Sequence, residues 1–158
     1  MATFLGGNGA FTPSGSADNY TLDQNTTAGA VGKVKYIAWG GRGTTSTGYR
    51  TRWTRPTTNG SSTFTSLNAT GNPSANPLTT SLLRLGTFAT PATLATDPAS
   101  NLFAIDWNVL GGGGILVLPI GGEWLVAYSA TAGHGQISCR NVAGTDASLS
   151  SYQISWEE

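Results

Sequence analysis

Several short runs of this chain alternate between apolar and polar residues with the two-residue period of β-strands. The run Tyr49–Arg55 (YRTRWTR) carries both of its aromatic residues and Thr51 on one face and its first two arginines on the other. The run Leu102–Leu110 (LFAIDWNVL) gathers four apolar side chains on one face and leaves Asp106 and Asn108 on the other. Because successive side chains of a strand point to opposite faces, each run predicts a strand with one buried face.

Turn-forming residues separate the other short runs, as expected of a protein built from strands. The further strands predicted are Lys33–Trp39, Ser62–Leu67, Gln136–Val142, Ser151–Trp156 and, with a single helical turn as the alternative, Ser81–Phe88. Asn68–Asn76 and Pro91–Ser100 are predicted loops, the second with a turn of helix at Thr93–Thr96. Eight or nine short strands at this spacing predict an all-β fold, a two-sheet β-sandwich that is jelly-roll-like.

The stretch Gly111–Gly133 is the predicted centre of the core. It contains two nearly continuous apolar runs, Ile115–Ile120 and Trp124–Tyr128, joined by Gly121-Gly122-Glu123. Paired glycines supply the positive φ of a tight turn, so the two runs predict a hairpin. Nearly continuous apolar runs predict that both faces of this hairpin are covered. Pro119 cannot donate to a ladder and predicts a strand end or an open edge.

Residues 1–32 show no clear period and are rich in Gly, Asn, Ser and Thr, with the isolated aromatic residues Phe4, Phe11 and Tyr20. We expect an extended N-terminal arm here, pinned by these aromatics against its own domain or a neighbour. Residues 33–158 then form a single β-sandwich domain. The arm and an open sheet edge are candidate assembly surfaces.

The chain is neutral overall, but its basic residues are concentrated in one segment. Only 10% of the residues are charged and the net charge is zero, which gives weak protection against association. No acidic residue lies between Asp23 and Asp97, whereas the basic block Lys33–Arg84 contains seven of the eight basic residues. Arg50, Arg52 and Arg55 could bind carboxylates or phosphates of a partner. Alternatively, the arginines pair with Asp106, Asp146 or the terminal glutamates of the same or a neighbouring subunit.

The candidate partner-binding residues are therefore Phe4, Phe11, Tyr20, Arg50, Arg52 and Arg55. Nucleic acid is an unfavoured partner despite the aromatic residues between the arginines, because the total charge is zero and no recognition motif occurs. Sugar binding is an alternative, with Trp39, Tyr49, Trp53 and Trp124 as candidate stacking platforms. Such residues at strand positions usually belong to the core.

No catalytic, metal or cofactor site emerges from the sequence. The single cysteine, Cys139, excludes an internal disulfide and is expected to be buried and inert. His134 is the only histidine, and its place between two glycines suggests a solvated turn rather than a partner for a nucleophile. Neither Gly111–Gly114 nor Gly40–Gly43 has the ending of a phosphate loop. The tetraglycine is instead a wide turn where another backbone can approach closely.

Two stretches, STGYRTRWTRP (Ser46–Pro56) and CRNVAGTDAS (Cys139–Ser148), are similar in character to phage-encoded proteins. With the Met1 start, the Gly/Thr/Asn-rich arm and the lack of enzymatic motifs, the chain resembles small β-structured virion proteins of tailed bacteriophages. These proteins include capsid decoration (cement) proteins and head-fibre modules. The resemblance implies a sandwich or jelly roll that self-assembles, often as trimers, and docks on the major capsid protein or another virion protein.

The sequence therefore predicts a non-enzymatic virion structural protein that oligomerises and stabilises the particle. A carbohydrate-binding, lectin-like module for host adhesion is the alternative. The N-terminal residues lack the basic and apolar regions of a signal peptide, and no apolar run has the length of a membrane span. We expect synthesis in the host cytoplasm and a final location in the virion, with no membrane partner and no cofactor.

Overall fold

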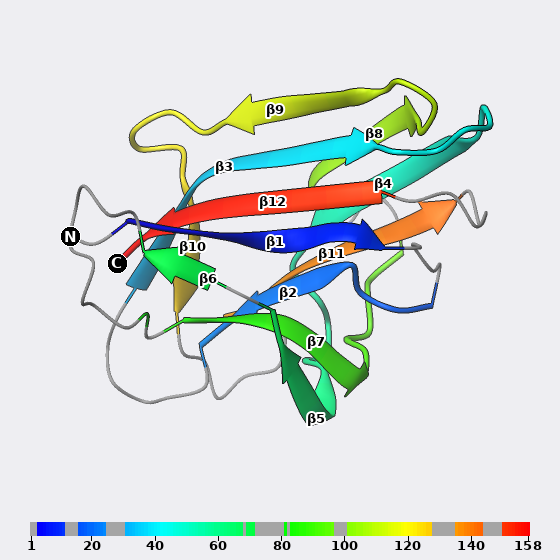
Figure 1. Cartoon of the computed structure of the whole chain (residues 1–158). Helices are drawn as coiled ribbons and strands as arrows, with labels where there is room; N and C mark the ends of the chain where they lie inside the picture. The colour runs from blue at the N-terminus through cyan, green and yellow to red at the C-terminus, as the bar shows by residue number, and fades with distance from the viewer. Residues whose placement is uncertain are drawn as a thin grey trace.

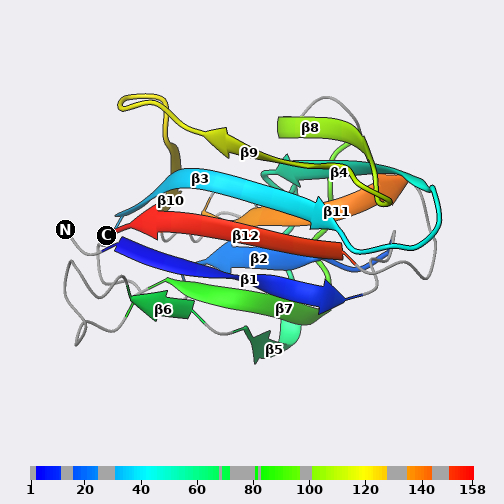
Figure 2. The same ribbon diagram turned by 45° about the horizontal axis from the view of Figure 1, so that its top comes forward.

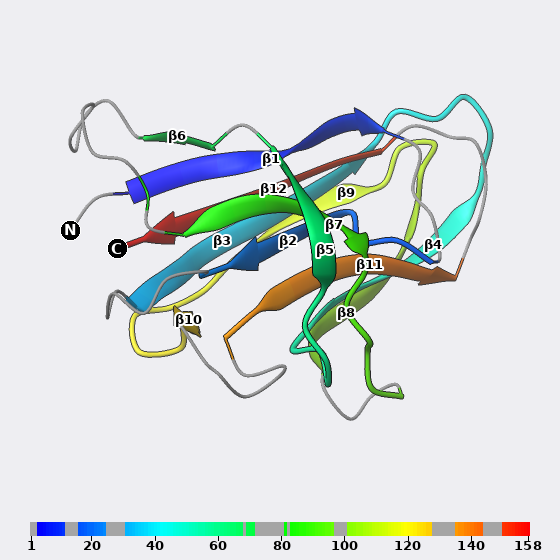
Figure 3. The ribbon, with the colours of Figure 1, turned by 90° about the horizontal axis from the view of Figure 1, so that it is seen from below.

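The computed structural model describes residues 3–11, 16–24, 31–67, 69–71, 81, 83–96, 101–127, 135–143 and 150–158. These residues form twelve strands in two antiparallel sheets and no helix (Figure 1). The all-β prediction is confirmed. The sheets stack face to face as a β-sandwich, which the turned views make visible (Figures 2 and 3).

Each sheet has six strands. Sheet A contains β1 (Thr3–Phe11), β3 (Val31–Gly41), β6 (Ala69–Gly71), β9 (Gly113–Val117), β10 (Trp124–Ala127) and β12 (Ser150–Glu157). Sheet B contains β2 (Tyr20–Asp23), β4 (Gly48–Thr54), β5 (Ser61–Ser66), β7 (Arg84–Thr90), β8 (Asn101–Asn108) and β11 (Ile137–Ala143).

The connections between these sheets give a jelly-roll topology. In sheet A the order β1-β12-β3-β9 forms the body, and in sheet B the order β2-β11-β4-β8 does so. The chain passes from one sheet to the other between β1 and β2, between β3 and β4, between β8 and β9, and between β11 and β12. Two Greek keys build a jelly roll in this way. The segment between β4 and β8 adds β5 and β7 to sheet B and β6 to sheet A.

The described part of residues 1–32 differs from the extended arm that the sequence suggests. β1 lies inside sheet A, between β12 and β6, and β2 lies inside sheet B, between β7 and β11. Glycine explains why β1 looks irregular in sequence: a Cβ on Gly7 would lie 2.2 Å from the Tyr152 carbonyl oxygen. The close approach of two backbones therefore replaces the usual apolar alternation, and this part of the chain belongs to the sandwich.

The predicted central hairpin is wrong, because β9 and β10 do not pair with each other. Both pair with the same edge of β3, β9 along its second half and β10 along its first. The turn between them is as predicted, since Gly121 has a φ of 86° and the Gly122 N–H donates to the Pro119 carbonyl (2.9 Å). Glycine at the third position of such a turn is typical of type II.

The core fills the space between the sheets with aromatic side chains from both. Trp53 and Tyr49 of β4 and Trp107 of β8 meet Tyr152 of β12 and Trp39 of β3. Ring centroids of neighbouring pairs lie 5.5 to 6.1 Å apart in tilted or edge-to-face arrangements, the geometry that aromatic quadrupoles favour. The alternation predicted correctly which face of β4 and of β8 is buried, since the aromatic residues of that face lie in this core.

A hydrogen-bond network centred on Asn141 connects the two sheets inside the core. The Oδ1 atom of Asn141, on β11, accepts hydrogen bonds from the Thr51 hydroxyl (2.8 Å), the Asn19 amide (3.0 Å) and the Tyr152 hydroxyl (2.7 Å). The Trp107 indole N–H donates to the Thr51 hydroxyl (2.9 Å). Because Tyr152 belongs to sheet A and the other residues do not, this network sets how the two sheets sit against each other.

Replacement of Asn141 by Ala is expected to lower the free energy of unfolding by about 3 kcal/mol or more, since several buried donors lose their acceptor together. The Tyr152→Phe variant removes one hydroxyl and leaves the amide in place, so its cost is expected near 1 kcal/mol. Denaturant unfolding monitored by tryptophan fluorescence measures both. Equal costs for the two variants would show that Asn141 does not organise the network.

Candidate assembly surface

The three arginines proposed as partner-binding residues are occupied within the chain. Arg50 lies 3.7 Å from Asp106 in an exposed ion pair across β4 and β8, as the structural alternative predicted. Arg52 is buried, with its Nε donating to the Asn101 side-chain oxygen (2.6 Å). Arg55 donates to the Leu125 carbonyl (2.7 Å), and burial lowers the pKa of its guanidinium.

Arg52 and Arg140 also hold a covering segment, residues 91–96, against the outer face of sheet B. Arg52 donates to the Ala95 carbonyl (3.2 Å), and Arg140 donates to the Ala92 carbonyl (2.7 Å). Arg140 is in turn paired with the buried carboxylate of Asp18 (2.8 Å). Burial raises the pKa of Asp18, and Arg140 opposes that shift. The outer face of sheet B is thus largely occupied by the chain itself.

Other members of the basic block have similar internal roles. Arg84 donates two hydrogen bonds to Asp23 (2.9 and 2.7 Å), and its guanidinium lies 4.3 Å from the ring centroid of Phe64. Lys35 bridges Glu123 (3.2 Å) and Glu157 (3.0 Å). Most of the block therefore serves intramolecular contacts.

The aromatic residues of the first 32 positions also turn inward where they are described. Phe4 is buried and stacks on Trp156 at a centroid distance of 5.7 Å. Tyr20 is fully buried, and its hydroxyl accepts a hydrogen bond from the Trp53 indole (2.6 Å). These two residues are pinned against their own domain. Phe11 ends β1 opposite Ser150, and its side chain lies outside the described part of the structure.

The candidate sugar platforms are mostly in the core. Trp39 is 9% exposed, Tyr49 1% and Trp53 0%, so none of these three offers a face to a sugar in solution. Trp124 is partly buried and packs against the core. Among the described residues, these four positions therefore do not favour the lectin-like alternative.

The described residues contain no grouping of three or more His, Cys, Asp or Glu side chains that could hold a metal. Cys139 is buried as a free thiol, as expected, and burial raises its pKa well above the usual value. His134 and Asp146 lie outside the described residues. In the described ranges there is also no helix of the length and apolarity needed to cross a membrane.

Exposed apolar side chains gather instead on one edge of sheet A, which we call the β9–β10 edge. Its members are Val31 (44% exposed), Ile115 (68%), Val117 (69%), Ile120 (96%) and Leu125 (48%). All five lie on β9, on β10, on the turn between them, or on the paired end of β3. Apolar clusters of this kind mark interaction sites in folded proteins, whereas scattered apolar residues do not. Sequence reasoning assigned this stretch to the core because its residues are apolar.

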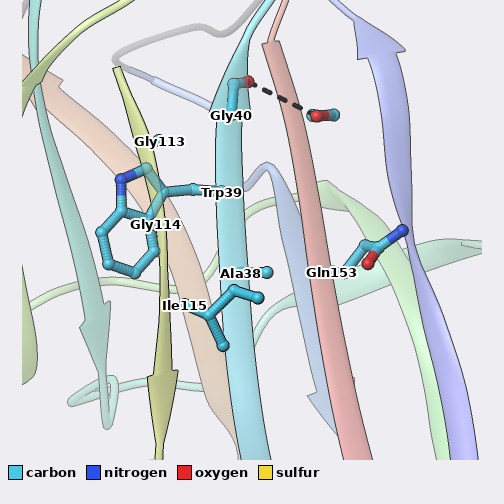
Figure 4. Close-up of a pocket in the computed structure, with 8 residues that line it drawn as sticks. Ala38, Trp39, Gly40, Gly113, Gly114, Ile115 and Gln153 are labelled. Carbon is cyan, nitrogen blue, oxygen red and sulfur yellow. Dashed lines mark hydrogen bonds between the residues drawn. The ribbon is translucent and has the colours of Figure 1, made fainter.

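A shallow cleft of about 440 Å³ continues this surface onto the outer face of sheet A. Ala38 and Gly40 of β3 form its floor, with Ile115 on one side and Gln153 and Ser151 on the other (Figure 4). The small floor residues leave the strand backbone accessible between larger neighbours. The cleft therefore gives the β9–β10 edge a recessed, partly polar border.

The tetraglycine Gly111–Gly114 includes the first two residues of β9 and lets this edge lie close to the core, with the close backbone approach that the sequence predicted. A Cβ on Gly113 would lie 2.8 Å from the Trp39 carbonyl oxygen. A Cβ on Gly114 would lie 2.8 Å from the Trp39 ring, whereas one on Gly111 would meet nothing within 4 Å. Side chains at Gly113 and Gly114 would push β9 away from β3.

Comparison of the chain with protein-family models, with curated proteins and with solved structures finds no match. The fold and the surfaces described above are therefore the grounds for a functional proposal.

Substitution of Arg52 by Ala is expected to cost about 2 kcal/mol of unfolding free energy, because hydrogen bonds of a buried charged group are lost. Arg50→Ala is the matched control on the same strand face, and its exposed ion pair predicts a cost below about 1 kcal/mol. Thermal unfolding of both variants tests the assignment. A larger loss for Arg50 than for Arg52 would contradict it.

Gly114 of β9 and Gly111 before it give a second matched pair. Gly114→Ala places a methyl group against Trp39 in a packed core and is expected to cost about 1–3 kcal/mol. Gly111→Ala meets open space and is expected to leave stability unchanged within about 0.5 kcal/mol. Denaturation midpoints compare the two, and similar midpoints would mean that β9 does not need this close approach.

Proposed function

We propose that this chain is a non-enzymatic structural protein of a phage particle, in which it self-associates and stabilises the assembly. The observation that carries the proposal is the β9–β10 edge, where large apolar side chains that a folded chain normally buries are concentrated in solvent. The assignment to a phage particle rests on the sequence resemblance alone. Jelly rolls occur in viral capsid proteins and in lectins, so the fold is compatible with the proposal and does not choose between these functions.

The contrast between the two outer faces supports an assembly role. Sheet B has its own chain folded over it, and its arginines are bonded to that chain. Sheet A leaves its β9–β10 edge and the adjoining cleft open. An assembly contact on sheet A would be mainly apolar, which differs from the basic partner-binding surface that the sequence suggested.

Light scattering of the purified full chain is expected to show a mass that rises with protein concentration. The association is expected to persist or strengthen at high salt, because apolar contacts are not screened and exposed charge pairs are. Loss of association at high salt would instead implicate charged residues such as Arg50. A monomer at every concentration and at both salt levels would contradict self-association.

The particle itself provides the second test. Mass spectrometry of purified phage particles whose genome encodes this chain is expected to detect it as a component retained through density-gradient purification. Detection in infected cells together with its absence from purified particles would contradict a structural role in the virion, whatever the chain does in isolation.

A further inference from the structure

The strand β9 has one edge bonded to β3 and an outer edge with which no described strand pairs. In Figure 1 it is the outermost strand of sheet A, on the far side of β3 from β12. The bonding to β3 is fixed at both ends: the Gly41 N–H donates to the Gly112 carbonyl (3.1 Å), and the Leu118 N–H donates to the Lys35 carbonyl (2.8 Å).

This pattern determines which groups face outward. Hydrogen-bonded and non-hydrogen-bonded pairs alternate along an antiparallel ladder, so the even-numbered residues between 112 and 118 direct their backbone groups toward β3. The N–H and C=O groups of Gly113, Ile115 and Val117 therefore point to the outer edge. The side chains of Ile115 and Val117 are on the exposed face of the sheet, at 68% and 69% exposure.

The other edge strands carry features that discourage pairing, which edge strands commonly need. β6 has only three residues, and the pairing of β5 with β7 is interrupted by a register shift between Ser61 and Phe64. β8 carries Asp106, whose side chain is 75% exposed. β10 has its Leu125 carbonyl occupied by Arg55. Among the described strands, β9 combines an unpaired edge with exposed branched apolar side chains and no such protection.

The charge of this segment indicates what can pair with it. The twelve residues Gly111–Gly122 carry no charge, and the next residue, Glu123, is paired with Lys35. A strongly acidic or basic strand would find no complementary charge here and would lose hydration on docking. A second copy of the same uncharged strand meets no such cost, and antiparallel edges are complementary to themselves under two-fold symmetry.

We propose that two copies of this chain join through antiparallel pairing of β9 with β9, centred on Ile115, so that the two A sheets become one continuous sheet. In this register Ile115 lies opposite Ile115 of the second copy, and Val117 lies opposite the second copy's Gly113. Each of these pairs exchanges two backbone hydrogen bonds. The glycine leaves room for the valine side chain, and all five residues of β9 are used. The inference rests on the proposed self-association and names its geometry.

The contact is small. One strand pair with its flanking apolar side chains lies at the low end of specific interfaces, below about 1,200 Å². Weak, concentration-dependent association is therefore expected in solution. In a particle that holds many copies close together, a high effective concentration compensates for a weak pair contact.

Sedimentation equilibrium of the full chain and three Ile115 variants tests the register. Ile115→Lys and Ile115→Glu each place like charges opposite each other, and each is expected to weaken dimerisation about tenfold or more. An equimolar mixture of the two is expected to form a mixed dimer within a few-fold of the wild-type affinity. Ile115→Pro removes an outward N–H that β3 does not use, and it is expected to abolish the dimer.

Leu125→Lys is the matched control, since Leu125 is exposed on the same sheet face but lies outside the β9 pair; its dimer should equal the wild-type dimer. Circular dichroism of each variant checks that the fold is retained. Association that is unchanged by the Ile115 substitutions, or a three-fold oligomer, would overturn the β9 pairing while leaving self-association in place. If Ile115→Lys and Ile115→Glu each weaken the dimer but their mixture does not restore it, the register centred on Ile115 would be overturned. A wild-type chain that stays monomeric would overturn both.

Discussion

The amide oxygen of Asn141 is the point on which the arrangement of the two sheets depends. It is buried and accepts hydrogen bonds from Thr51 and Asn19 on one side and from Tyr152 on the other. An unsatisfied polar group in such a core costs a large share of the stability of a domain, so a slip of one sheet over the other is strongly opposed. Tyr152 belongs to β12, β12 pairs with β3, and β3 carries β9. The exposed edge is thus held in place by a polar contact in the interior.

The exposure of a sheet face depends on the loops that fold over it, as the outer face of sheet B shows. Residues 91–96 lie over sheet B because Arg52 and Arg140 can reach their carbonyl groups from the polar faces of β4 and β11. Alternation in the sequence showed correctly that Arg52 points away from the core. It could not show that a loop some forty residues later along the chain would cover Arg52. A polar face defined by alternation is therefore not the same as a solvent-exposed face.

The strands could be predicted from the sequence where one face is apolar and the other polar, as in β4 and β8. The sandwich and its jelly-roll character followed from the number and spacing of such strands. Prediction failed where glycine replaces the alternation, as in β1, because a backbone contact such as that of Gly7 leaves no hydrophobic signal. It failed also for the pairing of β9 and β10. Turn residues of the right type show only that the chain reverses direction, not that the flanking strands pair with each other. Here β3 is long enough to pair with both strands in succession.

The apolar run at β9 led to the expectation that both of its faces are covered. In the single chain only one face is, with Leu116 and Leu118 toward the core and Ile115 and Val117 in solvent. Pairing of β9 with a second copy would remove part of this discrepancy by burying the outward side chains at the junction of the two sheets. The same pairing limits the danger of an unprotected edge. A two-fold contact uses the edge of both copies at once, so it closes at two chains and leaves no free β9 edge from which a fibre could grow.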